Sequence, residues 1–225
     1  MNRRYNSLFF DLDDTLLDFT FDEKNAILTT LEKYELPCGE DVYITYTEIE
    51  NWQVFNLGCD INSKTMVTSR FKVLLKMLEA TNTEEIIDYY YSLISKSHKL
   101  KKGTLKVLSY LKNKGYKLYL TTNGFPEFQY KRIKASRISG YFDGIFISEE
   151  IGSAKPSSSF FNYVMNHIPE SNRSKVLIIG DAPTADILGG INSKIDTCFL
   201  SENNKVCRFK YTYKIKNISD LLEIL

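Results

Sequence analysis

Two aspartates, Asp11 and Asp13, follow a short apolar run near the start of the chain, in the segment SLFFDLDDTLLDF. Residues two apart in an extended strand project to the same side, so both carboxylates face one way. Like charges held together repel and raise each other's pKa unless a cation lies among them. We therefore expect this pair to take part in cation binding or proton transfer, while the adjacent Asp14 caps the helix that follows.

Polar residues also follow other apolar runs, as expected for side chains gathered at one edge of a parallel sheet. They are Thr121 to Gly124 after KLYL, Asp181 after VLIIG, Asp186 five positions later, and Lys155 before Pro156. In an open α/β sheet, ligands collect beyond the carboxyl ends of the strands, near the point where the strand order reverses. The sequence therefore predicts that these side chains converge with the aspartate pair.

Three converging carboxylates, those of Asp11, Asp13 and Asp181, imply a hard divalent cation with oxygen ligands, most simply Mg²⁺. A site with Mg²⁺, a hydroxyl, a lysine and free backbone N–H groups suits the dispersed negative charge of a phosphoryl group in transfer. Asp11 would then be the nucleophile. Asp13 would donate a proton to the leaving oxygen and afterwards take one from the water that hydrolyses an aspartyl-phosphate.

The elements that must position these residues alternate in type along the carboxyl half of the chain. Short β-branched or aromatic runs predict buried parallel strands at 5–10, 116–122, 143–148, 175–181 and 196–201. Helix-like stretches lie at 104–115, 126–138, 157–168 and 184–194, and ISDLLEIL closes the chain as a helix. This rhythm predicts an α/β fold with a Rossmann-like, parallel-sheet core.

The segment 17–99 has helical and aromatic patterns and no convincing strand. We interpret it as a helical domain inserted directly after the first strand, standing over the carboxyl edge of the sheet. The core domain would then comprise residues 1–16 and 100–225.

Composition excludes several classes of protein. A chain of 225 residues with 43% hydrophobic residues can bury a sizeable core, and its net charge of +1 gives no field to gather nucleic acid or anionic lipid. No run approaches the length of a membrane span or a signal peptide, so we expect a cytoplasmic protein. The cysteines form no C-x-x-C pair and are expected to be reduced: Cys38, Cys59, Cys198 and Cys207.

Four motifs, DLDDT, TTNG, AKP and GDAPTAD, resemble in order and spacing those of haloacid dehalogenase (HAD) superfamily phosphatases. The resemblance implies a helical C1 cap for the insert and assigns roles by position. Asp11 resembles the nucleophile, Asp13 the general acid/base, and Thr122 and Lys155 the phosphate clamp, with Asn123 and Gly124 beside them. Asp181 resembles the metal ligand, joined by Asp11 and the backbone carbonyl of Asp13, and Asp186 the acidic residue that supports the lysine or the waters on the metal.

Asp13 favours phosphate esters over haloacids, because the true dehalogenases of the superfamily lack an acid at that position. TTNGF, YFDGIFISEEIGSAKP and ADILGGIN, together with NWQVFNLG in the insert, are similar to the pyrimidine 5′-nucleotidase branch called YjjG/YfnB. The implied substrate is a small phosphate monoester, a nucleoside 5′-monophosphate. We expect the protein to be a monomer or a weak homodimer, and we expect neither a nucleic acid polymer nor a membrane as its partner.

Several alternatives stay open. A sugar-phosphate phosphatase or phosphomutase of the same superfamily would share the motifs, and a phosphate-accepting receiver domain or a non-catalytic binding module would share some of them. Thr121 competes with Thr122, although strand alternation favours Thr122. Some residues of the insert could contact a base or sugar, yet aromatic residues at helical spacing are more often core: Trp52, Phe55, Arg70 and Phe71.

Overall fold

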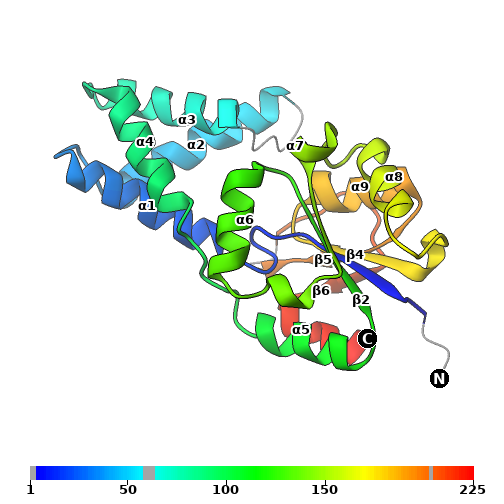
Figure 1. The fold of residues 1–225 in the computed structure, drawn as a ribbon. Helices are drawn as coiled ribbons and strands as arrows, with labels where there is room; N and C mark the ends of the chain where they lie inside the picture. Colours follow the sequence, from blue (N-terminus) through cyan, green and yellow to red (C-terminus); the bar gives the residue numbers. More distant parts are fainter. Residues whose placement is uncertain (1–3, 58–63, 203–204) are drawn as a thin grey trace.

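A six-stranded parallel sheet forms the centre of the computed structural model, which describes residues 4–57, 64–202 and 205–225. Its spatial order is β3-β2-β1-β4-β5-β6 (Figure 1). This is the order of a Rossmann-like sheet, and the predicted α/β class is confirmed. The strands are β1 (Ser7–Phe10), β2 (Lys117–Thr122), β3 (Gly144–Ile147), β4 (Val176–Gly180), β5 (Asp196–Leu200) and β6 (Tyr213–Ile215).

Alternating side chains of each central strand pack into two different hydrophobic cores, one on each face of the sheet. Leu8 and Phe10 of β1 pack with α5 (Thr104–Asn113) and α10 (Leu221–Ile224), whereas Phe9 packs with Phe160 and Phe161 of α8 (Ser158–Asn166). Neighbouring strands β2 and β4 divide their side chains in the same way. Both faces of the sheet are therefore covered, which explains why the strands read as continuous apolar runs.

The predicted strands and helices of the core are present with shorter bounds, and three features differ from expectation. The stretch predicted as a helix at 184–194 begins as a π-helical turn, Pro183–Ile187, before α9 (Leu188–Ser193). Helix α7 (Ser148–Ile151) and strand β6 were not predicted. The remaining core elements are α6 (Pro126–Ala135) and 3₁₀ turns at Ser139–Tyr141, Arg173–Lys175 and Ile218–Asp220.

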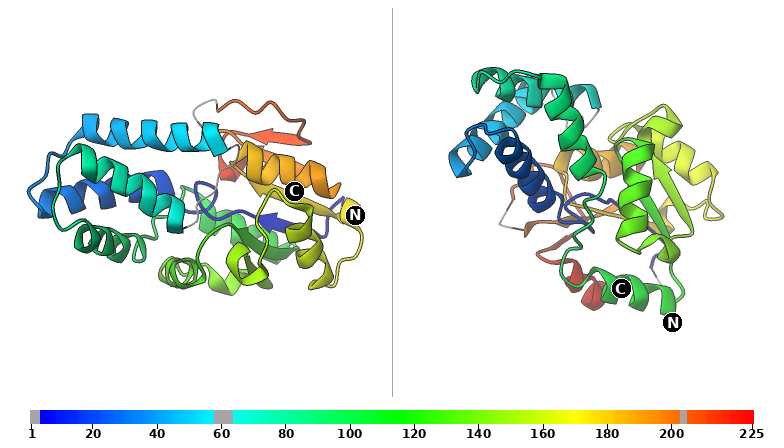
Figure 2. Two further views of the ribbon diagram at one scale, coloured as in Figure 1. Left: turned by 90° about the horizontal axis from the view of Figure 1, so that it is seen from above. Right: turned by 60° about the vertical axis from the view of Figure 1, so that its left-hand side comes forward.

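The segment between β1 and α5 is helical, with no strand among its described residues. It forms α1 (Phe19–Lys33), α2 (Glu40–Leu57), α3 (Lys64–Met77) and α4 (Thr83–Ile94), which stand together beside the sheet (Figures 1 and 2). These helices share a hydrophobic core of their own, centred on Ile27, Tyr46, Phe71 and Tyr90. We call α1 to α4 the cap helices; the domain boundaries at 16 and 100 stay a prediction.

Two further expectations concern cysteines and membranes. Cys38, Cys198 and Cys207 are free thiols, and Cys59 lies outside the described residues. Of the helices in the described part of the chain, none is long and apolar enough to cross a membrane.

Candidate active site

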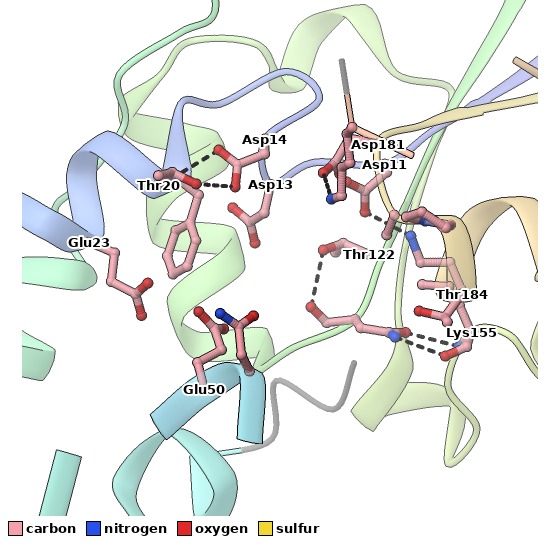
Figure 3. Close-up of a pocket in the computed structure, with 17 residues that line it drawn as sticks. Asp11, Asp13, Asp14, Thr20, Glu23, Glu50, Thr122, Lys155, Asp181 and Thr184 are labelled. Atoms are coloured by element: carbon pink, nitrogen blue, oxygen red, sulfur yellow. Dashed lines mark hydrogen bonds and ion pairs between the residues drawn. The ribbon is translucent and has the colours of Figure 1, made fainter. Parts of the chain in front are cut away.

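The site lies at the carboxyl ends of β1 and β4, where the strand order reverses. Phe10 pairs with Leu120 of β2 on one side and Ile179 of β4 on the other, so Asp11 emerges level with both neighbouring strand ends. Its backbone N–H still donates to Ile179 O at 2.9 Å. A cavity of about 460 Å³ opens here, and six predicted site residues line it (Figure 3): Asp11, Asp13, Thr122, Asn123, Lys155 and Asp181.

Lys155 joins two buried carboxylates. Its Nζ donates to Asp11 Oδ1 at 2.7 Å and to Asp186 Oδ1 at 2.6 Å. The second oxygen of Asp186 accepts the backbone N–H of Ala182 at 3.1 Å. Asp186 is itself fully buried and holds the lysine through this hydrogen bond.

Gly180 makes room for that arrangement. A Cβ at this position would lie 2.1 Å from Asp186 Oδ2, closer than any real contact. The glycine before Asp181 therefore lets the Asp186 carboxylate fold under the end of β4 and reach Lys155.

Burial sets the electrostatics of the site. It raises the pKa of Asp11 well above the ordinary value; repulsion from Asp186 and Asp181 adds to this, and Lys155 opposes it. Burial also raises the pKa of Asp181 to about 6. Although burial by itself lowers the pKa of Lys155, its two carboxylate partners raise it overall, so the lysine stays charged. Two acids with raised pKa values in one site favour a bound cation.

The donor set fits a hard divalent ion. Asp11, Asp181 and Asp186 each offer a carboxylate oxygen, and these oxygens lie within 4.8 Å of one another. Lys205 already places a cation there, because its Nζ donates to Asp181 Oδ2 at 3.0 Å. An all-oxygen, carboxylate-rich set is what Mg²⁺ prefers. The Asp13 carboxylate is not part of this cluster; the family resemblance implies a contribution from its backbone carbonyl.

The Asp13 carboxylate is held from the opposite side by helix α6. Arg132 Nη2 donates to Oδ1 at 2.6 Å, and Gln129 Nε2 donates to Oδ2 at 3.0 Å. Neither α6 residue was predicted from the sequence. Their spacing of three places them on one face of a helix, but no local pattern indicates what that face contacts.

Asp14 has the structural role expected of it. Its carboxylate accepts the backbone N–H of Thr20, in the first turn of α1, at 2.9 Å and the hydroxyl of the same residue at 2.7 Å (Figure 3). It therefore satisfies a free donor at the helix start.

The two threonines at the end of β2 separate as strand alternation predicts. Thr121 Oγ1 donates to Phe10 O at 3.3 Å inside the sheet, and Thr121 does not line the cavity. Thr122 lines the cavity and accepts the Gln129 amide at 2.9 Å.

Asn123 and Gly124 have different hydrogen-bond partners. The Asn123 side chain pairs with the Lys155 backbone, accepting its N–H and donating to its carbonyl, each at 3.0 Å. This amide therefore positions the lysine segment. The Gly124 N–H donates to Ser148 Oγ at 3.1 Å, and Gly124 lines a smaller neighbouring cavity and not the main one.

Cap helices α1 and α2 supply the far wall of the cavity, which the sequence reading did not identify. Glu23 and Glu50 lie across it from Asp11 and Lys155 (Figure 3), together with Phe19, Thr20 and Asn51. Three of the four cap candidates named from the sequence do not line this cavity. Trp52 is 66% exposed and lines another cavity, Phe71 is in the cap core, Arg70 is buried and pairs with Glu50, and the side chain of Phe55 is outside the described residues.

Glu23 is a buried acid within this wall. Its Oε1 accepts the hydroxyls of Tyr46 at 2.9 Å and Tyr90 at 3.1 Å. Burial, strengthened by repulsion from Glu50, raises the pKa of Glu23 to about 7. A period of four from Phe19 is the sequence signal that places it on the same face of α1.

Comparisons with known proteins agree with this geometry. The family described as haloacid dehalogenase-like hydrolase matches residues 5–194. The chain is 35% identical to YfnB of Bacillus subtilis, described as a HAD-hydrolase, over 99% of this chain and 96% of that one. It is 30% identical to the pyrimidine 5′-nucleotidase PynA of Streptococcus pneumoniae, over 98% and 95%. A crystal structure of YfnB bound to magnesium, which reveals interdomain movement, superposes with a TM-score of 0.90, covering 99% of each chain.

Proposed function

This chain belongs to the haloacid dehalogenase-like hydrolase family, and we propose that it is a Mg²⁺-dependent 5′-nucleotidase that works through an aspartyl-phosphate on Asp11. The observation that carries the proposal is the buried Asp11 held by Lys155 beside Asp181, with Asp13 on the wall of the same cavity. The similarity to PynA supports a nucleoside 5′-monophosphate as the substrate.

The first chemical step uses the position of Asp11. Lys155 holds Oδ1, so the other carboxylate oxygen is the one that attacks phosphorus. As the new O–P bond forms, the bond from phosphorus to the leaving oxygen breaks, and Asp13 gives that oxygen a proton. The products of this half-reaction are a nucleoside and a phosphorylated Asp11.

The second step regenerates the enzyme. Asp13, now a carboxylate, takes a proton from water while the water oxygen attacks phosphorus. The bond between phosphorus and Asp11 breaks, which releases inorganic phosphate and restores the Asp11 carboxylate, and Asp13 is again protonated for the next ester. Overall, one ester and one water become one alcohol and one phosphate.

The residues around Asp11 fit the implied Mg²⁺. Asp11 and Asp181 would hold it with their carboxylates, and when bound it would neutralise charge on the phosphoryl oxygens. Lys155 and the Thr122 hydroxyl would bind the same oxygens from the protein side. Asp186 keeps Lys155 in place and lies off the cavity wall.

The cavity also suits the size of a nucleotide. At about 460 Å³ it lies within the range of pockets that bind small molecules. Reacting groups occupy one side, and the cap residues Glu23, Glu50 and Asn51 line the other. A nucleoside moiety would therefore extend from the phosphate site toward the cap helices.

A receiver domain is not favoured, because receivers have the sheet order 2-1-3-4-5, with the first strand next to the third. Here β1 lies between β2 and β4 in a six-stranded sheet.

The test is phosphate release from pyrimidine and purine nucleoside monophosphates, sugar phosphates and phosphoglycolate, with Mg²⁺ and with chelator. We expect metal-dependent release, fastest from pyrimidine monophosphates, and none in Asp11→Asn. Release only from the other esters would keep the mechanism and reject the nucleotidase; transfer to a second sugar would favour a mutase.

A further inference from the structure

We propose that Gln129 and Arg132 of α6 are positioning residues for the proton transfer by Asp13, and that Arg132 connects this acid to both chain crossings between core and cap. The inference rests on the proposed role of Asp13 as proton carrier. It concerns two residues outside the four motifs.

Each oxygen of Asp13 has its own donor from α6. Arg132 Nη2 lies 2.6 Å from Oδ1, and Gln129 Nε2 lies 3.0 Å from Oδ2. Two donors on the two oxygens fix the plane of the carboxylate, where one bond would leave it free to rotate. Each oxygen retains a lone pair for the transferred proton, because a carboxylate accepts about four hydrogen bonds.

The orientation of the Gln129 amide is set by its neighbours. Its oxygen accepts Arg132 Nη1 at 2.8 Å, so its NH₂ group must face the other way, toward Asp13 and Thr122. That single NH₂ therefore ties the proton carrier to the hydroxyl proposed to bind phosphate. The positions of these two groups relative to each other depend on one buried amide.

The Gln129 side chain lies close to the backbone of Gly124. This glycine has a φ of +147°, and a Cβ there would lie 3.0 Å from Gln129 Nε2. Besides its proposed role near the substrate, the glycine of the TTNG motif thus leaves space for the Gln129 amide that holds Asp13.

Arg132 extends the network to the base of the cap. Its Nε donates to Ser97 Oγ at 3.2 Å, and its guanidinium lies 4.8 Å from the centre of the Phe19 ring. Phe19 begins α1, where the chain leaves the core, and Ser97 follows α4, where the chain returns. Both segments pass close to α6 in Figure 1. Arg132 is therefore the shared contact of the acid and both crossings.

A buried arginine is also consistent with a purely structural role. Arg132 is 2% exposed and Gln129 is 3% exposed, and a charge so buried needs a partner whether or not that partner reacts. The two roles differ in one measurable respect. A positioning role affects only the steps in which Asp13 moves a proton, whereas general loosening of the site slows every substrate.

The experiment measures the rate of alcohol release in the first turnover, with Mg²⁺ present, in Arg132→Gln and Gln129→Met. It compares two substrates whose leaving groups differ. A nucleoside 5′-monophosphate has a poor leaving group that needs a proton, and p-nitrophenyl phosphate has one that does not. We expect each variant to slow nucleoside release by at least about 30-fold, a part of the roughly 100- to 10,000-fold that general acid catalysis contributes. In Arg132→Gln the nitrophenolate burst should change by less than about 3-fold, since no proton is required. Gln129→Met also loses the bond to Thr122, so its nitrophenolate burst can fall, but by less than its nucleoside release.

Controls separate this effect from damage to the helix. Lys131→Gln removes a charge from the same helix, but Lys131 is exposed and pairs with Glu127, so neither rate should change. Arg132→Lys keeps the charge and should recover part of the nucleoside rate. In Asp13→Asn, adding Arg132→Gln should cost no further rate, because the group that Arg132 positions no longer carries a proton.

Three results would overturn the inference: equal slowing of both leaving groups, no slowing of either, or a multiplicative loss in the double variant. If Arg132→Gln does not fold, Gln129→Met carries the same test. If the wild-type protein releases no phosphate from nucleotides but hydrolyses another alkyl monoester, the nucleotidase assignment fails, and the comparison is made with that ester.

Discussion

Lys155 and Asp11 are 144 positions apart in the chain, and Nζ of the lysine lies 2.7 Å from Oδ1 of the aspartate. The pair is buried beside Asp186, which accepts a second hydrogen bond from the same amine. Because these three side chains are almost completely buried, each charge depends on the others. This dependence makes the site testable one residue at a time.

Replacing the proposed nucleophile should abolish turnover and spare the fold. Asp11→Asn keeps the shape of the side chain, and Lys155 keeps its bond to Asp186. We expect phosphate release to fall by at least about 1,000-fold, since the covalent route is lost. Phosphate assays and circular dichroism check this, and ordinary turnover in the folded variant would refute the mechanism.

Removing Lys155 should destabilise the protein through the carboxylates it leaves behind. We expect Lys155→Met to lower the free energy of unfolding by about 3 kcal/mol without metal, as for other broken buried ion pairs. Adding Asp186→Asn should restore part of that loss, because one buried charge is removed. Urea unfolding of the single and double variants measures both effects; a double variant less stable than Lys155→Met would contradict this account.

Magnesium should stabilise the folded protein through Asp181. At about 100 times its dissociation constant, Mg²⁺ would add about 2.7 kcal/mol relative to chelator. Asp181→Asn should lose most of this gain. Lys205→Gln should keep or increase it, because Lys205 competes for the same carboxylate. Thermal unfolding over a Mg²⁺ titration tests this, and an unchanged metal response in Asp181→Asn would exclude the proposed ligand.

Glu23, a residue of the cap helices, should make the stability of the protein depend on pH. Its pKa in the folded protein is raised to about 7 from an ordinary 4.5, so folding favours the protonated form. The contribution is complete below the ordinary pKa and is lost as pH rises through 7. Relative to Glu23→Gln, the wild-type protein should therefore lose up to about 3 kcal/mol between pH 4.5 and 8.

The comparison is made by urea unfolding of both proteins across that pH range. Asp11 and Asp181 titrate in both and cancel in the difference between them. Parallel stability profiles for the wild-type protein and Glu23→Gln would show that this carboxylate is not held as described.

Much of the site could be predicted because several of its residues stand next to recognisable strands in the sequence. Asp11 and Asp181 directly follow their strands, and parallel strands deliver the residues at their carboxyl ends to one edge. Alternation along β2 likewise separated Thr122 from Thr121. Strand β6 was missed although YTYKI alternates, because it is short and follows a long irregular stretch.

Strand periodicity and motif spacing were enough to predict the α/β class, the family and the residues at the strand ends, because both are properties of short segments. The surroundings of those residues became visible only in the folded chain. The contact between Arg132 and Asp13, and the place of Glu23 on the far wall, depend on how α6 and α1 pack against the core. Such packing is set by contacts between distant segments, and neither side chain carries a local signal of its partner.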